Sequence, residues 1–243
     1  MAIAVTVDEL EPARARLLDL HPEGFEEADG ELAVYTDGDG EEALRELFGA
    51  VSSTLVEPGW EERWREFHRP VRIGDLWVGP PWEEPPDDAI AVVVDPGRAF
   101  GTGSHPTTRL CLELLLELDR GSLLDVGCGS GVLSVAAAKL GFSPVVAVDR
   151  DPAALEATGR NADANGVAVD ASLADALGIA LPRADVALAN IDLASVEALG
   201  PVVDVSVLVT SGYFHGREPR VAGFVKRERR VDGGWAADLF VRE

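Results

Sequence analysis

A glycine-rich turn, Asp125-Val-Gly-Cys-Gly-Ser-Gly131, constrains the fold of this chain more than any other segment. It follows the apolar run Ser122-Leu-Leu and precedes the small apolar residues of Val132–Lys139, which predicts a strand, a tight turn and a helix. Glycine permits positive φ angles and has no Cβ, so a ligand can approach the backbone closely at the start of the helix. The segment therefore predicts a βα unit that binds a ligand.

A second acidic residue supports this interpretation. Val145-Val-Ala-Val-Asp149 predicts the next strand, and Asp149 stands at its end. A carboxylate at the tip of the second strand of such a sheet can accept hydrogen bonds from two ribose hydroxyls. The two segments together predict a site for a cofactor that contains a nucleoside.

The spacing of the glycines indicates which cofactor. Gly127, Gly129 and Gly131 follow a G-x-G-x-G pattern after Asp125, whereas the dinucleotide fingerprint is G-x-G-x-x-G. The observed spacing resembles that of Rossmann-like methyltransferases, whose cofactor is S-adenosylmethionine. Asp125 can place negative charge near the ammonium of that cofactor, directly or through water. The alternative is an NAD or FAD fold with a degenerate loop.

Charge and composition limit the classes of partner. The chain has 243 residues and a net charge of −22, of which residues 1–60 carry −12. An acidic surface disfavours direct contact with nucleic acid and favours a basic protein partner, although it also serves solubility alone. No apolar stretch is long enough to span a membrane, and the N-terminus has no signal-peptide pattern. We expect a monomer without a membrane partner.

The two cysteines and four histidines add little chemistry. Cys111 and Cys128 lie in different elements, so a disulfide is not expected and a reducing cytoplasm fits the chain. The histidines are scattered singly and no metal-ligand spacing occurs. The sequence therefore predicts no metal site.

The order of the expected elements predicts two domains in an α/β protein. Residues 1–57 follow a β-α-β-β-α-β pattern, with helices over 8–20 and 40–50, that predicts a small ferredoxin-like α+β domain. Residues 58–89 are rich in proline and tryptophan and predict a packed linker. Residues 90–243 alternate strands and helices, which predicts a mainly parallel sheet whose last strand is antiparallel. Its strands are expected over 91–95, 122–125, 145–149, 167–170, 185–190, 205–211, 223–231 and 235–242.

A second motif precedes the helix expected over 109–118. Asp95-Pro-Gly-Arg-Ala-Phe-Gly-Thr-Gly-Ser-His-Pro-Thr-Thr108 combines three glycines, two prolines and several hydroxyl side chains, which predicts a shaped loop. The free N–H groups at the helix start attract a carboxylate or phosphate. The alternative is an ordinary loop followed by a capped helix.

The motifs together resemble the methyltransferase family of bacterial ribosomal protein L11. The resemblance rests on the loop Ala99–Thr108, the glycine turn, Val148-Asp-Arg-Asp-Pro152 and Ala189-Asn-Ile191. It extends upstream through Trp60-x3-Trp64, Phe67-His-Arg-Pro70, Ile73-Gly74 and Pro81-Trp82. Residues 60–243 carry it well, whereas residues 1–59 match only in architecture. The resemblance implies a Rossmann-like class I methyltransferase domain behind a small domain that recognises the substrate protein.

The resemblance also implies roles for particular residues. Thr108, Gly127, Asp149 and Asn190 match positions that bind S-adenosylmethionine in that family. We add Asp125 and Gly129 of the glycine turn to the candidate cofactor site. Phe100 is expected either to form an apolar wall over the cofactor or to pack in the core.

The implied reaction is transfer of methyl groups to lysine or N-terminal amines of ribosomal protein L11. Asn190 offers a donor and an acceptor beside the reacting methyl. His105 and Asp192 are candidate bases, with loss of the proton to solvent as the default. The sequence departs from the family at Ser104, where many members have histidine, at Asp192, where a neutral residue is common, and in the short segment 193–203.

Two other functions remain open at this point. The first is a class I methyltransferase that acts on a small molecule or RNA, although the chain lacks an Asn-Pro-Pro-Tyr motif and reads Asn190-Ile-Asp-Leu193. The second is a catalytically silent protein that binds S-adenosylmethionine.

Overall fold

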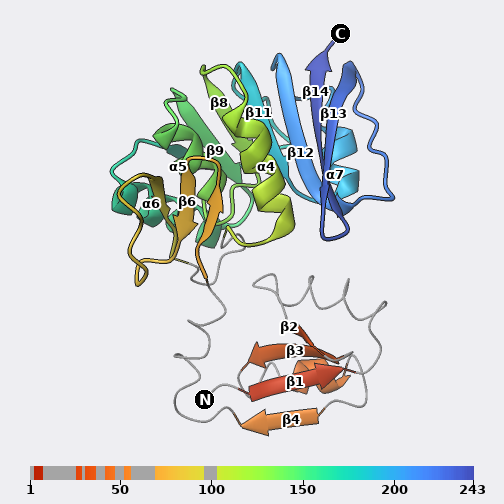
Figure 1. Ribbon diagram of the computed structural model, residues 1–243. Helices are drawn as coiled ribbons and strands as arrows, with labels where there is room; N and C mark the ends of the chain where they lie inside the picture. Colours follow the sequence, from red (N-terminus) through yellow and green to blue (C-terminus); the bar gives the residue numbers. More distant parts are fainter. Residues whose placement is uncertain are drawn as a thin grey trace. The chain divides into compact units, whose positions relative to one another are not determined.

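The computed structural model describes residues 3–7, 26–28, 31–36, 42–46, 52–55, 69–95 and 103–243. The chain divides into two compact units, Met1–Phe67 and His68–Glu243. Figure 1 shows both, coloured along the sequence.

The first unit contains a four-stranded antiparallel sheet. Its strands β1 (Ile3–Val7), β2 (Glu26–Ala28), β3 (Glu31–Thr36) and β4 (Ser52–Leu55) have the order β2-β3-β1-β4. Residues 42–46 are helical and Leu44 among them is buried. The helix expected over 8–20 lies outside the described residues, so the ferredoxin-like arrangement stays a prediction.

The second unit is built on a seven-stranded sheet with the order β10-β9-β8-β11-β12-β14-β13. Strand β14 lies between β12 and β13 and is antiparallel to both, whereas the other pairs are parallel. This confirms the mainly parallel sheet with an antiparallel last strand. The strands are β8 (Leu123–Val126), β9 (Val145–Asp149), β10 (Asp170–Leu173), β11 (Val186–Asn190), β12 (Val207–Phe214), β13 (Phe224–Asp232) and β14 (Trp235–Arg242).

Helices cover the two faces of this sheet unequally. Helices α4 (Pro106–Leu116) and α5 (Val132–Lys139) lie on one face together with α6 (Pro152–Asn165), and the short α7 (Leu193–Ala198) lies on the other (Figure 1). Each face has its own apolar core, the first around Leu112 and Val135 and the second around Leu208 and Phe240. Among the described residues, none of the helices combines the length and apolar character needed to cross a membrane.

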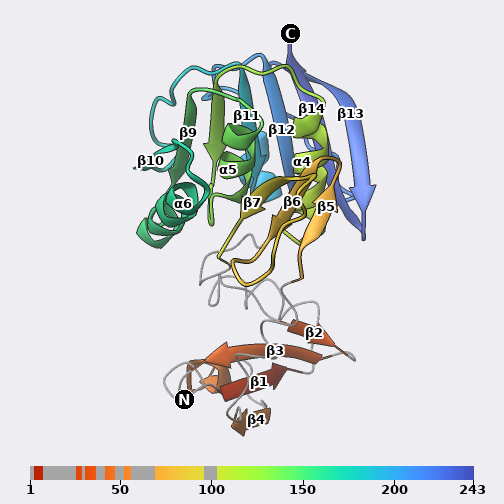
Figure 2. The same ribbon diagram turned by 60° about the vertical axis from the view of Figure 1, so that its left-hand side comes forward.

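A separate three-stranded sheet packs on the face that carries α4 and α5. Strands β5 (Val71–Ile73), β6 (Leu76–Gly79) and β7 (Ile90–Val93) form it, and Figure 2 shows it in front of these helices. The described part of the expected linker thus contains β5 and β6. Strand β7 was expected over 91–95 among the strands of the large sheet, and this expectation is wrong: the backbone of β7 pairs in parallel with β6, whose residues are all buried, in the separate sheet.

Several boundaries differ from the sequence-based expectations, and hydrogen bonds explain two of them. The third strand of the large sheet runs over Asp170–Leu173 rather than 167–170. Val167 is held by the end of α6, where its N–H donates to the carbonyl of Ala162 at 3.1 Å. Helix α4 begins at Pro106, three residues early, because His105 caps it and proline suits the first helical position.

Candidate functional site

A cavity of about 360 Å³ opens at the carboxyl ends of β8, β9 and β11. Parallel strands all present their carboxyl ends at one edge of a sheet, which is where α/β proteins bind their ligands. The structure brings five of the candidate cofactor residues together in the lining of this cavity: Thr108, Gly127, Gly129, Asp149 and Asn190. Asp192 lines it as well, whereas Phe100 lies outside the described residues.

The glycine turn between β8 and α5 forms one wall. Gly127 has φ +74°, a conformation that residues with a Cβ rarely adopt. A Cβ at this position would lie 2.4 Å from Cγ2 of Ile191, far inside van der Waals contact. Gly127 is therefore required both by the backbone conformation and by the close approach of the segment that follows β11.

Asp149 closes the turn from the neighbouring strand. Its Oδ2 accepts a hydrogen bond from the N–H of Gly129 at 3.0 Å, and its Oδ1 accepts one from the N–H of Asp151 at 3.0 Å. An ionised carboxylate has about four lone-pair sites, so each oxygen keeps capacity for a further donor. The carboxylate is thus fixed in place and able to receive ribose hydroxyls.

Asp125 lies beneath the turn, rather than among the residues that line the cavity. It is 1% exposed, and its Oδ2 accepts a hydrogen bond from the Ser134 hydroxyl at 2.5 Å. Its Oδ1 has no hydrogen-bond partner among the described residues. Burial raises the pKa of Asp125 to about 6; the Ser134 hydrogen bond opposes this rise and the charge of Asp149 adds to it. A buried carboxylate oxygen without a donor suits a cationic ligand or a bridging water.

Asn190 stands at the tip of β11, opposite Thr108 in the first turn of α4. Its Nδ2 donates a long hydrogen bond of 3.5 Å to Oγ1 of Thr108, which is fully buried. The Oδ1 of Asn190 is a buried acceptor without a partner among the described residues. The side chain therefore presents an available acceptor beside the cavity.

The segment after Asn190 is held from two sides. Strand β12 has an irregularity at Gly212, whose φ is +101°. A Cβ at Gly212 would lie 2.1 Å from the carbonyl oxygen of Ile191, while the side chain of Ile191 approaches Gly127 on the other side. The backbone beside Asn190 is therefore fixed between two glycines that are far apart in the sequence.

Asp192 caps α7. Its Oδ1 accepts a hydrogen bond from the N–H of Ser195 at 3.0 Å, and its Oδ2 accepts one from the Ser195 hydroxyl at 2.6 Å. Burial favours a higher pKa for Asp192, but these hydrogen bonds outweigh it and hold the pKa below its usual value. The carboxylate therefore stays ionised at the edge of the cavity.

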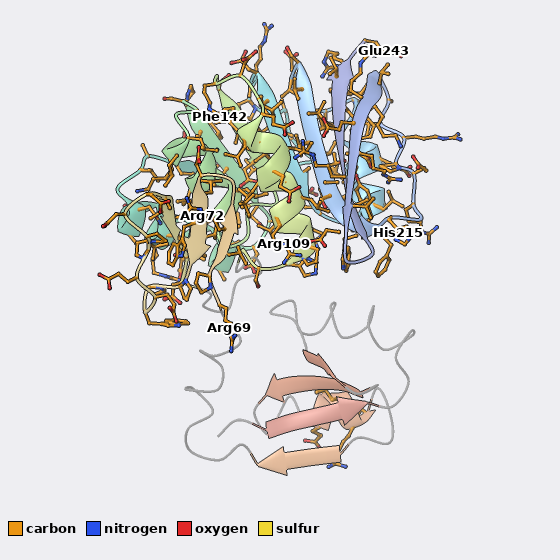
Figure 3. The ribbon with its side chains drawn as sticks, viewed as in Figure 1. Arg69, Arg72, Arg109, Phe142, His215 and Glu243 are labelled. Atoms are coloured by element: carbon orange, nitrogen blue, oxygen red, sulfur yellow. The ribbon has the colours of Figure 1, made fainter. Side chains whose placement is uncertain are left out.

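His105 caps α4 and is not among the residues that line the cavity. Its Nδ1 accepts a hydrogen bond from the N–H of Thr107 at 3.3 Å, and its ring contacts Trp235 edge-on at 4.9 Å. Burial lowers its pKa, as does the charge of Arg109. Arg109, labelled on α4 in Figure 3, forms an ion pair with Asp232 that ties the helix to the hairpin of β13 and β14.

Several lining residues carry no signal that sequence reasoning detected. They come from the connection after β10 and from the start of α7, and include Ala174, Asp175, Ala176, Leu177 and Ser195. The connection after β10 reaches the cavity only because β10 pairs with β9, which no motif reveals.

The charge of the cavity selects a class of ligand. Of the charged side chains in the described part of the chain, Asp149, Asp175 and Asp192 line the cavity with one basic residue, Arg150, and Asp125 lies beneath the turn. Such a wall disfavours a pyrophosphate and favours a cationic ligand. With the order of the seven strands and the glycine turn, these features define a class I S-adenosylmethionine-dependent methyltransferase.

Comparisons with known proteins narrow this class. A sequence model described as "Ribosomal protein L11 methyltransferase (PrmA)" matches residues 25–237. The ribosomal protein L11 methyltransferase of Vibrio parahaemolyticus is 40% identical over 205 residues, which are 78% of this chain and 68% of that protein. The Escherichia coli enzyme of the same name is 43% identical over 169 residues, or 65% and 55% of the two chains. This chain belongs to the ribosomal protein L11 methyltransferase family.

A solved structure agrees with the assignment. The crystal structure of a ribosomal protein L11 methylase from Lactobacillus delbrueckii superposes with a TM-score of 0.64 at 26% identity. The match covers 72% of this chain and all of that one. The α/β class I fold expected from the sequence is therefore confirmed.

S-adenosylmethionine is the methyl donor of this class, and the residues present fit it. Gly127 permits close approach of the ligand, and Asp149 is placed for ribose hydroxyls. The unpartnered oxygen of Asp125 lies below the turn, where it can compensate a positive charge directly or through water.

Asp125 gives a pH-dependent prediction. Because the pKa of Asp125 in the folded state is raised to about 6, the folded state disfavours the ionised form. The protonated carboxyl therefore contributes its full stabilisation below the usual carboxyl pKa, and this contribution is lost as the pH rises through 6. Asp125→Asn is expected to raise the free energy of unfolding of the ligand-free protein at pH 7.5 by about 3 kcal/mol, and by much less at pH 4. Urea unfolding at both pH values measures this. An equal gain at both would contradict it.

Proposed function

We propose that this chain transfers methyl groups from S-adenosylmethionine to lysine or N-terminal amines of ribosomal protein L11. The names of its relatives support this substrate. The observation that carries the proposal is the free acceptor of Asn190 at the edge of a cavity that also contains Thr108, Gly127 and Asp149. An acceptor there suits an amine, which must present N–H groups to the enzyme while its lone pair points at the methyl.

When bound, S-adenosylmethionine supplies a methyl group on a positively charged sulfur. The attacking amine must be neutral, and a free lysine has a pKa of about 10.4. The Oδ1 of Asn190 accepts an N–H hydrogen bond and holds the nitrogen in line. With Thr108, Gly127 and Asp149 holding that donor, the neutral nitrogen beside Asn190 would take the methyl group as the carbon–sulfur bond breaks, and the methylated amine would release its extra proton to water.

Asp192 and His105 are weak proton acceptors in this setting. Hydrogen bonds from Ser195 hold the pKa of Asp192 below its usual value, and burial lowers that of His105. Because the pKa of each group lies far below that of a lysine ammonium, neither is a suitable base, and the amine loses its proton to solvent before attack. Asp192 instead attracts the cationic lysine to the cavity edge. Hydrogen bonds from Ser195 keep the Asp192 carboxylate ionised there.

The proposal extends to partners and location. A net charge of −22 favours a basic ribosomal protein over nucleic acid as the contact. Methylation of a bacterial ribosomal protein takes place in the cytoplasm. The enzyme acts as a monomer, which size-exclusion chromatography with light scattering tests directly.

One assay tests the reaction against its alternatives. The protein is incubated with methyl-labelled cofactor and purified ribosomal protein L11, total RNA or buffer. Label in L11 supports the proposal, and label only in RNA supports a different methyltransferase. Cofactor binding without transfer to any acceptor supports a silent binding protein.

The first unit gives a separate prediction. A chain that begins at His68 retains every described residue that lines the cavity. It is expected to bind S-adenosylmethionine within about threefold of the full chain, and to lose L11 methylation because substrate recognition resides in the removed part. Calorimetry and the label assay measure the two properties. Full L11 methylation by the shortened chain would remove the recognition role from the first unit.

A further inference from the structure

Helix α6 carries a buried polar stripe. Thr158, Asn161 and Asn165 share one face of the helix and are 0%, 3% and 9% exposed. A helix that covers a sheet ordinarily buries an apolar stripe, and buried polar groups are costly unless they are hydrogen-bonded. The polar side chains of this stripe are therefore expected to form hydrogen bonds that stabilise the fold.

Two of these residues hold the glycine turn from outside the cavity. The Asn161 Nδ2 donates to the carbonyl of Ser130 at 2.8 Å, and the Thr158 hydroxyl donates to the carbonyl of Gly129 at 3.2 Å. Asp149 holds the N–H of Gly129 at 3.0 Å from the adjacent strand. Side chains from β9 and α6 thus hold the conformation of a turn whose glycines have no side chains of their own to restrain it.

The other end of the Asn161 amide binds a different part of the chain. Its Oδ1 accepts a hydrogen bond from the N–H of Asp95 at 3.0 Å, two residues after the end of β7. Asn165 bonds to β7 through the N–H of Val93 at 2.9 Å and its carbonyl at 2.6 Å, and its Nδ2 also donates to the carbonyl of Asn161 at 2.7 Å. Asn161 thus joins the glycine turn to the end of β7, whereas Asn165 bonds to that strand and to its own helix.

This difference matters because glycine is conformationally permissive. Gly127, Gly129 and Gly131 all have positive φ, and such a turn loses much freedom when a ligand orders it. Fixing the turn beforehand removes that cost from the binding free energy. We propose that Asn161 is a positioning residue of the methyl-donor site, which clamps the glycine turn in the shape that binds the cofactor. The inference rests on the proposed function, in which this cavity binds S-adenosylmethionine.

The decisive substitution is Asn161→Asp in the full chain. It keeps an acceptor for the N–H of Asp95 but replaces the donor to Ser130 with a second oxygen. The dissociation constant for S-adenosylmethionine, measured by calorimetry, is expected to rise about tenfold because the turn loses a buried hydrogen bond. The KM for the cofactor rises in parallel, while kcat at saturating cofactor stays within about threefold.

Asn165→Asp is the matched control, with the same change of atoms on the same face of α6. It removes the donor to the carbonyls of Val93 and Asn161 and is expected to lower the unfolding temperature, but to change cofactor affinity less than about twofold. Thr158→Val removes the second donor to the turn and keeps the shape of the side chain. It is expected to weaken cofactor binding severalfold, and it decides the question if Asn161→Asp does not fold by circular dichroism.

Each outcome separates the clamp from the proposed function. Failure of the wild-type protein to bind S-adenosylmethionine overturns the proposed function and the clamp together. If the wild-type protein binds the cofactor and folded Asn161→Asp binds it with the same affinity, the clamp alone is overturned. If Asn161→Asp does not fold, unchanged affinity in Thr158→Val overturns it instead. Equal weakening in Asn165→Asp also overturns it, because a side chain without a hydrogen bond to the turn would then matter as much as Asn161.

Discussion

Replacement of Asn190 by alanine is expected to lower kcat for L11 methylation about 100-fold, the range seen when a group that orients a reacting atom is removed. The side chain provides the unpartnered acceptor at the cavity edge, and alanine leaves no group there to hold the amine. Cofactor affinity is expected to fall less than about tenfold, because Thr108, Gly127 and Asp149 remain. Single-turnover kinetics at saturating cofactor measure the chemical step.

Asp192→Asn supplies the comparison that gives this result its meaning. The amide keeps an oxygen for the N–H of Ser195 and so preserves the start of α7. We expect a loss of about tenfold or less, seen mainly in the KM for L11, because only the attraction of the cationic lysine is reduced. A loss in kcat equal to that of Asn190→Ala would make Asp192 the base and overturn the release of the proton to water.

The parts of the site that sequence reasoning predicted lie in short, continuous patterns. Strands β9 and β11 are apolar runs that end in Asp149 and Asn190, and Asp125 stands one residue before the end of β8, so these side chains could be placed near strand ends without a structure. The edge strand β10 exposes most of its side chains and has no such pattern, which explains both its shifted boundary and the missed wall of the cavity. A strand that is buried on both faces has a continuous apolar sequence, and this allows it to be predicted from the sequence.

Other features depend on contacts between distant segments. The approach of Gly212 to Ile191 requires the register of β11 on β12, and the contacts of Asn161 with Ser130 and Asp95 require three separate elements to be packed. His105 shows the same limit, since its position in a loop was evident but its capping of α4 was not. Residues whose role is to hold other residues are therefore found from the packed structure.

Gly127→Ala is expected to raise the dissociation constant for S-adenosylmethionine about 100-fold or more. The new Cβ would meet Cγ2 of Ile191 at 2.4 Å, at a residue with φ +74°. To relieve this clash, either the turn must move into the cavity or Ile191 must move away. The backbone of Ile191 packs closely against Gly212 on its other side, which limits that movement. Calorimetry with the cofactor measures the loss.

Gly166→Ala separates this clash from backbone strain. Gly166 ends α6 with φ +65°, close to that of Gly127, but a Cβ there meets no atom within 4 Å. The left-handed conformation costs a residue with a Cβ about 1 kcal/mol wherever it occurs, so both variants should lose similar stability from this source. Only Gly127→Ala should lose the cofactor. If the two variants bound it equally well, the approach of Ile191 to the turn would not shape the site, and the acceptor of Asn190 would be held in place by other means.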